Sequence, residues 1–243
     1  MDIFLALLAL FLGGVMKGAT GAGAPVIATP ALTLLFNIQT AVAVFVVPNL
    51  LSNIWQFWRF RRHVLDHRFL MLFAGSGFAG AILGTWFLVV LNQQTLSLLM
   101  ACAVIAFIAL RLSRPDWILP RWLAQKLAFP VGLLGGVLQG ATGVSAPASL
   151  SFLNAMRLPR SSFIGTISVF FVAMSLAQLP ALWVAGLISP YSLALGLGSL
   201  AMIALGMPFG NWLAQRWSAR TFDRVMLTLL ALLAAKILLG TLT

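Results

Sequence analysis

Two stretches of sequence decide the fold: GATGAGAP at residues 18–25 and GATGVSAP at residues 140–147. Each stretch lies within apolar sequence, where its glycines and proline are expected to interrupt a helix. Each leads into a short apolar segment, 25–36 or 147–156, with proline at a favoured first helical position. At about 1.5 Å per residue, these segments span little more than half of the roughly 30 Å hydrocarbon core of a bilayer. The sequence therefore predicts two broken helices that return within the membrane.

The remainder of the chain is dominated by long apolar runs. Of its 243 residues, 61% are hydrophobic and 8% are charged, whereas a soluble domain has about 45–50% apolar and about 25% charged residues. Six of the runs, or nearly so, are long enough to cross a bilayer. The predicted helical segments are 3–19, 25–36, 41–58, 69–91, 96–111, 127–141, 147–156, 161–183, 192–214 and 225–241. We therefore expect an all-α polytopic membrane protein.

The two breaks belong to an internal duplication. Residues 12–15 (LGGV) match residues 134–137, and the breaks match at the same offset of 122 residues. At an offset of 126, the aligned pairs are Gly80 with Gly206, Gly84 with Gly210, Trp86 with Trp212, and Thr95 with Thr221. We predict a single membrane transport domain, 1–243, formed by repeat 1 (about 1–112), a cytoplasmic linker (about 113–121) and repeat 2 (about 122–243).

The distribution of basic residues predicts the orientation. Thirteen of the 15 Lys and Arg residues lie in four connections, 59–68, 111–126, 157–160 and 216–224. Such connections are expected to face the cytoplasm, which is possible if each short segment forms a hairpin with the helix before it and both termini face outward. Each half then has one hairpin and three crossings, so the second half is inverted. Inverted repeats are typical of secondary transporters, whose substrate sites lie near the midplane between the repeats.

The breaks are the first candidate site. Irregular backbone at membrane depth must be buried in protein or line a cavity, and helix N-termini present free N–H groups and a positive dipole end to anions. The candidate substrate-binding residues are Thr20, Gly21, Ala22, Gly23 and Ala24 in the first break and Thr142, Gly143, Val144, Ser145 and Ala146 in the second. The alternative is that the glycines only permit close packing, because Gly14-x-x-x-Gly18 and Gly136-x-x-x-Gly140 also fit the small-xxx-small pattern.

Lys17, just before the first break, is the next candidate. A charge within the membrane is costly and by default suggests function, although a lysine can also extend its amine to the interface, which is the better interpretation for Lys236. The position that matches Lys17 in the second half is Gln139, which is a further candidate. Only the first half would therefore offer a charged side chain to an anion at this position.

Polar residues on two further apolar segments complete the candidate site. Asn49 and Asn53 lie with Gln56 on one helical face, and Ser168, Ser175 and Gln178 lie on the matching segment. These side chains either line the substrate path or form hydrogen bonds between helices. Both interpretations fit the sequence.

Other patterns point to no further chemistry. The dinucleotide-like GSGFAG at residues 75–80 follows no strand, and His63 and His67 lie in an arginine-rich loop. A signal peptide ending at Ala24 is disfavoured because the same motif recurs inside the chain. The single cysteine, Cys102, excludes a disulfide framework. We expect that the protein is not an enzyme and binds no cofactor, metal or nucleic acid. Its expected partners are a small anion and the lipid bilayer, and it is expected to be a monomer or a homodimer.

The two glycine-rich breaks resemble those of the sulfite exporter TauE/SafE family, which typically has G-x-x-x-G-x-x-G-x-G-G-x-x-x-x-P near the start of each half. Gly14, Gly18, Gly21, Gly23 and Pro30 stand close to this pattern, as do Gly136, Gly140 and Gly143 in the second half. Ala24 and Val144-Ser145 depart from it. The resemblance covers essentially the whole chain and implies a transporter of sulfite, organosulfonates such as sulfoacetate, or related anions in the bacterial inner membrane.

The distribution of acidic residues limits the mechanism. The four acids, Asp2, Asp66, Asp116 and Asp223, lie outside the interiors of the predicted spans, so a carboxylate proton relay is not expected. The hypothesis is a facilitator, or a weakly coupled exporter, in which the repeats rock around the paired helix ends. The alternatives are a coupled importer of a related organic anion, using Na⁺ bound by backbone carbonyls, and a membrane scaffold or assembly subunit that transports nothing.

Overall fold

In a computed structural model of the chain, residues 2–113, 117–217 and 219–242 are described, and this part contains helices and no strand. The helices are α1 (Asp2–Thr20), α2 (Ala24–Leu35), α3 (Ile38–Phe60), the 3₁₀ turn η1 (Arg61–His63), α4 (His67–Val90), α5 (Gln93–Ser113), α6 (Arg121–Thr142), α7 (Ser149–Ala155), α8 (Arg160–Val184), α9 (Pro190–Arg216) and α10 (Ala219–Leu242). The all-α prediction is confirmed. Residues 114–116 of the predicted linker and residue 218 of a basic connection lie outside the described residues.

Five of the described helical segments are long and apolar enough to cross a membrane, compared with the six or nearly six predicted from sequence. They are α3 together with η1, α4, α5, α8 and α9. The predicted segment 225–241 corresponds to α10, which is not among these five. All eight tryptophans are exposed on the outside of the bundle, where their amphipathic rings suit a membrane surface.

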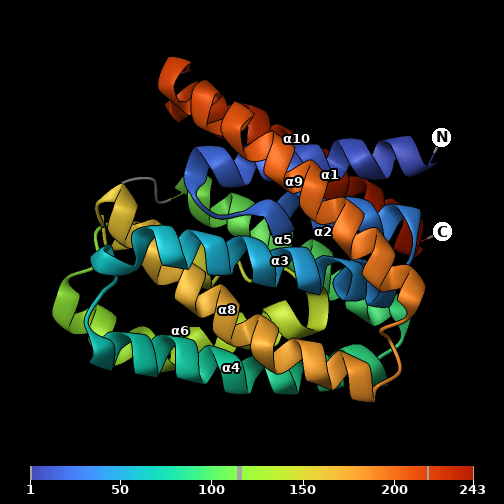
Figure 1. Cartoon of the computed structure of the whole chain (residues 1–243), viewed down its shortest axis with the longest axis horizontal. Helices are drawn as coiled ribbons and strands as arrows, with labels where there is room; N and C mark the ends of the chain where they lie inside the picture. The colour runs from blue at the N-terminus through green and yellow to red at the C-terminus, as the bar shows by residue number, and fades with distance from the viewer. Residues whose placement is uncertain (1, 114–116, 218, 243) are drawn as a thin grey trace.

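The connections divide by charge between the two ends of the molecule. In Figure 1, the basic connections α3–α4, α7–α8 and α9–α10 lie on the left, together with the segment before α6. The uncharged connections α2–α3, α4–α5 and α8–α9 lie on the right, where both chain ends are marked. We call the left end the basic end. That it faces the cytoplasm stays a prediction from its charge.

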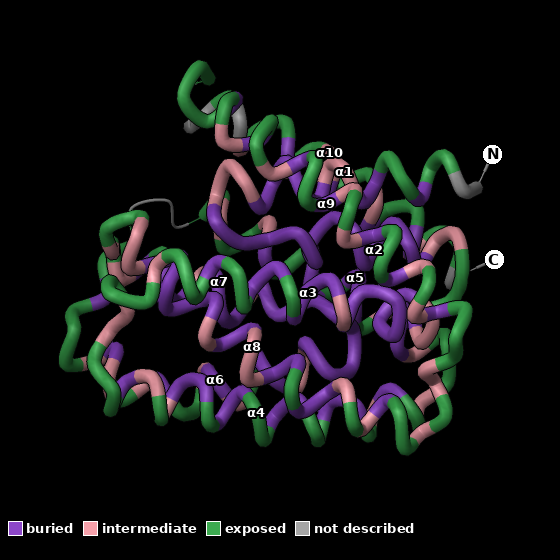
Figure 2. Tube along the Cα trace, viewed as in Figure 1, coloured by how far each residue is buried: buried purple, intermediate pink, exposed green. Residues whose placement is uncertain are grey.

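Both short helices begin beside the middle of the helix that precedes them. A side-chain carbon at Gly13 would lie 3.0 Å from the Ala24 carbonyl, and one at Gly135 would lie 3.7 Å from Ala148 Cβ. The break after α1 therefore carries the chain back along α1 before α2 starts. In Figure 2, α2 and the chain leading into it are almost entirely buried.

The second short helix is shorter than expected. The prediction was 147–156, but α7 starts at Ser149, so Pro147 precedes the helix instead of opening it. The start is irregular because the Ala146 carbonyl accepts from the N–H groups of both Leu150 and Ser151, each at 3.2 Å. At seven residues, α7 has little helix dipole to offer a ligand.

Close packing of glycines joins the two halves of the sequence. Gly14 and Gly18 of α1 lie against the α9 backbone at Ile203 and Met207, and Gly206 and Gly210 face back toward α1. The pair α4 and α6 packs in the same way, through Gly80, Gly84, Gly136 and Gly140. α3 also packs against α8, and α5 against α10. Each of these pairs takes one helix from each half, although the inverted relation of the halves stays a prediction.

Candidate functional site

The first break is held by Thr20, the last residue of α1. Its hydroxyl lies 2.8 Å from the Met16 carbonyl oxygen and also contacts the Ala22 carbonyl oxygen, and it can donate its proton to either. The same hydroxyl accepts a hydrogen bond from the Ala22 N–H at 3.3 Å. Gly21 (φ 85°) and Gly23 (φ 97°) adopt left-handed conformations, which glycine tolerates without steric cost. The local sequence thus ends α1 and redirects the chain into α2.

The second break has nearly the same construction. The Thr142 hydroxyl donates to the Leu138 carbonyl at 2.7 Å and accepts from the Val144 N–H at 3.2 Å, and Gly143 has φ 72°. Ser145 occupies the position of Gly23, and its Oγ lies 3.0 Å from Ser149 Oγ. Both predicted threonine hydroxyls are therefore engaged in holding the backbone of the breaks.

Buried backbone N–H groups remain without acceptors at both breaks. In the described part of the chain, the N–H groups of Gly23 and Ala24 have no hydrogen-bond acceptor, nor do those of Ser145 and Ala146. All four residues are buried. Because more than about 90% of buried backbone N–H groups in proteins are paired, these four donors identify the breaks as places where an acceptor is missing.

Lys17 begins a chain of polar contacts across the bundle. Its side chain is 1% exposed, and its Nζ donates to Asn53 Oδ1 at 2.8 Å. Asn53 Nδ2 contacts Asn49 Oδ1 at 2.9 Å, and Asn49 Nδ2 donates to Ser175 Oγ on α8 at 3.1 Å. The predicted residues Lys17, Asn49 and Asn53 therefore lie together, and Asn49 connects them to the second half. The partner of the charge is the neutral amide of Asn53.

Three buried side-chain oxygens near the breaks have no partner within the described residues: Thr29 Oγ1, Gln56 Oε1 and Gln139 Oε1. Thr29 lies against Gly143, so it belongs to the second break although it comes from α2. Gln178 Nε2 reaches the carbonyls of Gln139 and Gly140, at 3.4 and 3.3 Å. The backbone of Gln139 thus contacts α8, while its side-chain oxygen keeps its accepting capacity.

The two interpretations of the glycines apply to different residues. Gly14, Gly18, Gly136 and Gly140 form close helix contacts, as the packing alternative requires. The glycines inside the breaks have left-handed backbones instead. Each break also packs on the other half, since Gly21 lies against Ile164 of α8, and Gly143 lies against Val42 of α3.

A vestibule of about 580 Å³ lies at the basic end and reaches the first break. Thr20 and Ala22 line its inner part, while Arg111, Arg157 and Arg160 contribute positive charge. Arg111 is paired with Asp223 at 2.8 Å. Lys17 does not line the vestibule, so the break residues separate the buried lysine from this cavity.

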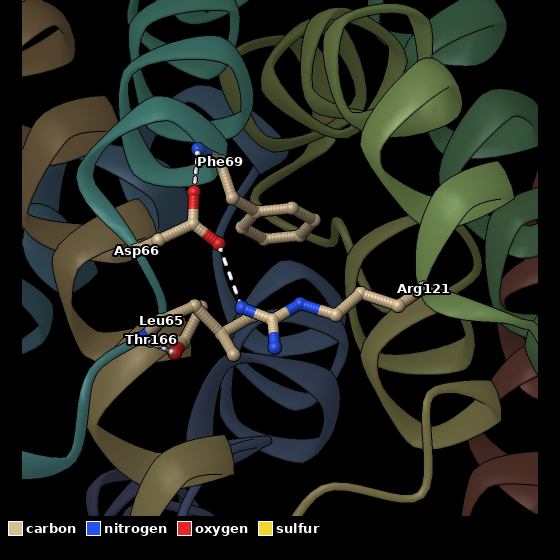
Figure 3. Close-up of polar contacts among 5 residues, drawn as sticks. All are labelled: Leu65, Asp66, Phe69, Arg121 and Thr166. Carbon is tan, nitrogen blue, oxygen red and sulfur yellow. Dashed lines mark hydrogen bonds and ion pairs between the residues drawn. The ribbon is translucent and has the colours of Figure 1, made fainter.

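A second ion pair joins the halves at the basic end, as Figure 3 shows. Asp66 caps α4 by accepting from the Phe69 N–H at 3.0 Å, and its other carboxylate oxygen lies 3.1 Å from Arg121 Nη2 at the start of α6. The backbone hydrogen bond, together with the guanidinium, holds the pKa of Asp66 below its usual value despite partial desolvation. This carboxylate therefore stays ionised at neutral pH and holds α4 to α6.

Some residues of the region had no signal as site residues in the sequence. Thr29 was not a candidate, because a threonine in a short apolar helix is unremarkable. Arg160 counted only as one basic residue of a connection, yet its guanidinium contacts the Gly18 carbonyl and Asn211 Oδ1, at 3.0 and 3.2 Å. Asn211 could have been found from the sequence, because its amide side chain directly follows the Gly206-x-x-x-Gly210 pattern in an apolar segment.

Comparison with known proteins places these features in a family. No curated protein and no solved structure gives a significant match to the chain. The family model described as "Sulfite exporter TauE/SafE" matches residues 6–237, nearly the whole chain. The resemblance inferred from the glycine-rich breaks is therefore confirmed. The chain belongs to the sulfite exporter TauE/SafE family, a family of membrane transporters for sulfite and related anions.

Proposed function

We propose that this transporter exports small sulfur-containing anions, such as sulfite or organosulfonates, and binds them at the two breaks within the membrane. The observation that carries the proposal is the set of four buried N–H groups without acceptors, at Gly23, Ala24, Ser145 and Ala146. Sulfite and sulfonate oxygens are hydrogen-bond acceptors. The N–H groups of Gly23 and Ala24 lie at the start of α2, and helix starts bind such anions, whereas those of Ser145 and Ala146 lie in the irregular turn before α7. A bound anion would supply the acceptors that the protein lacks.

Lys17 supplies the charge in this proposal. Its ammonium has a neutral amide as its partner, and the two carboxylates whose side chains are described, Asp66 and Asp223, pair with arginines instead. A charge in the membrane interior normally pairs with another charge or faces a cavity. An anionic substrate would act as the missing counterion, and Asn53 would hold the lysine in position between transport events.

The vestibule supports a route from the basic end. Its arginines would raise the local anion concentration, and Thr20 and Ala22 lie where it meets the first break. From there the anion would move to the level of Lys17 as the two halves rock around the breaks. The contacts of Gly21 with Ile164 and of Gly143 with Val42 are the ones that such a motion would rearrange.

The membrane potential would drive export. With the basic end in the cytoplasm, an inside-negative potential favours exit by about 2.3 kcal/mol per charge for each 100 mV. The transport step would then need no carboxylate relay, in keeping with the positions of the four acids in the sequence. We therefore propose a facilitator, or a weakly coupled exporter, that works by alternating access.

The test is sulfite flux in proteoliposomes with a potential imposed and with equal Na⁺ and proton concentrations on both sides. We expect flux whose direction follows the potential and which is absent from protein-free liposomes. Flux that starts only when a Na⁺ or proton gradient is added would contradict the facilitator mechanism and favour a coupled importer. Absence of flux under all gradients, with no binding of sulfite or sulfonates, would leave the scaffold alternative.

A further inference from the structure

A second cavity, of about 600 Å³, lies on the side of the bundle between α3 and α9. Its walls are mainly apolar, and Leu51 and Trp55 of α3 are exposed beside it, with 40% and 55% of their surfaces accessible. We call this cavity the lateral groove. The groove is separate from the vestibule, but Arg160 and Asn211 line both.

The length of the lateral groove corresponds to one leaflet of a bilayer. Along α9, its lining extends from Leu200 to Asn211, a span of roughly 16 Å at 1.5 Å per residue. That is about half of the hydrocarbon core. Along α9, the groove therefore covers a length equal to about one leaflet and ends toward the basic end. Its volume lies in the range of about 300–1,000 Å³ seen for small-molecule sites.

Charge is concentrated at one end of the groove. Arg160 lies at the first residue of α8, at the basic end, and is the charged residue among those that line the groove. Its Nη2 donates to the carbonyls of Gly18 and Ala19 and to Asn211 Oδ1, which fixes the guanidinium in place. Its Nε and Nη1 have no acceptor in the described part of the chain. These donors lie at the basic end of the groove.

We propose that the lateral groove binds an acidic phospholipid from the leaflet at the basic end. The phosphate would accept hydrogen bonds from Arg160, as basic pockets between transmembrane helices do with anionic headgroups, and one acyl chain would lie between α3 and α9. Gly18 and Gly21 line the same groove, so the bound lipid contacts the end of α1 and the first break. Lipid binding is a second role for Arg160, which also lines the vestibule.

The experiment compares retention of dioleoylphosphatidylglycerol and dioleoylphosphatidylcholine by the delipidated full chain, using native mass spectrometry. We expect the anionic lipid to be retained in preference to the neutral one. Arg160→Gln should reduce that preference roughly fivefold, the equivalent of about 1 kcal/mol per basic residue near a membrane surface. The matched control is Arg62→Gln, an exposed arginine of η1 at the same end that does not line the groove.

A second pair of variants tests the acyl-chain site without touching charge. Ala204 is exposed and lines the groove, so Ala204→Phe should fill it and reduce retention of the anionic lipid, whereas Ala201→Phe, exposed on α9 outside the groove, should not. The proposal is overturned if the two lipids are retained equally, or if Ala204→Phe retains lipid as the wild type does. Displacement of the lipid by millimolar inorganic phosphate would instead identify a site for a soluble anion.

Discussion

Replacing Lys17 with methionine should separate function from stability, because the substitution removes a buried charge while keeping a long apolar side chain. A lysine at the centre of a membrane helix costs about 2.5–3.5 kcal/mol to insert, and this is an upper limit for Lys17, which lies in the last turn of α1. Loss of the hydrogen bond to Asn53 leaves a buried amide oxygen unpaired, which costs about 1–3 kcal/mol. The variant should therefore be at most about 2.5 kcal/mol more stable than the wild type.

The same substitution should weaken anion binding. A hydrogen bond to a charged group contributes about 1.5–3 kcal/mol, which corresponds to roughly 10- to 150-fold in the dissociation constant. The assay is thermal unfolding in detergent against sulfite or ethanesulfonate, with chloride as the control anion. A ligand that binds the native state raises Tm, and the shift grows with the logarithm of the ratio of ligand concentration to dissociation constant. Lys236→Met, on the exposed side of α10, is the matched control and should bind as the wild type does. Unchanged sulfite binding in Lys17→Met would refute the role of Lys17.

Three further substitutions test other parts of the site and fold. Asn53→Asp would give Lys17 a permanent counterion, so we expect sulfite binding and flux to be lost while the protein still folds; wild-type flux would contradict competition for the lysine. Gly18→Ala places a carbon against the α9 backbone and should lower the free energy of unfolding by about 1–3 kcal/mol. Gly198 has open space around it, so the control Gly198→Ala should cost no stability. Urea or thermal unfolding measures both effects. Asp66→Ala removes a helix cap that contributes about 1 kcal/mol to the free energy of unfolding. Because the folded state lowers the pKa of Asp66, this loss of stability should be full at pH 7 and should shrink as the pH falls below about 4. A stability difference between variant and wild type that does not change with pH would contradict this.

The breaks could be predicted from sequence because their physical signals are local. Glycine and proline within an apolar run leave few alternatives to a broken helix, and the repetition of the motif 122 residues later made the pattern specific. The apolar runs located the helices for the same reason, although α6 and α10 each begin six residues before the predicted segments 127–141 and 225–241. The start of α7 also differs from the prediction, since Pro147 suggested an ordered first turn, whereas the shared Ala146 carbonyl makes that turn irregular.

The contacts across the bundle could not be predicted in the same way. A sequence shows that Lys17 and Asn53 are polar, but their hydrogen bond depends on how α1 and α3 are rotated, which packing over the whole bundle decides. Similarly, Thr29 joins the second break only because α2 lies against Gly143. Local patterns thus identified the candidate residues, and tertiary packing determined which of them meet.

The most direct test is to locate a bound anion in crystals of the protein soaked with selenite, a close analogue of sulfite whose selenium scatters X-rays anomalously. If the anion binds at the breaks, the anomalous peak should lie about 4 Å from Lys17 Nζ and within reach of the N–H groups of Gly23 and Ala24. A peak confined to the vestibule arginines, or no peak in protein that transports sulfite, would contradict binding at the breaks.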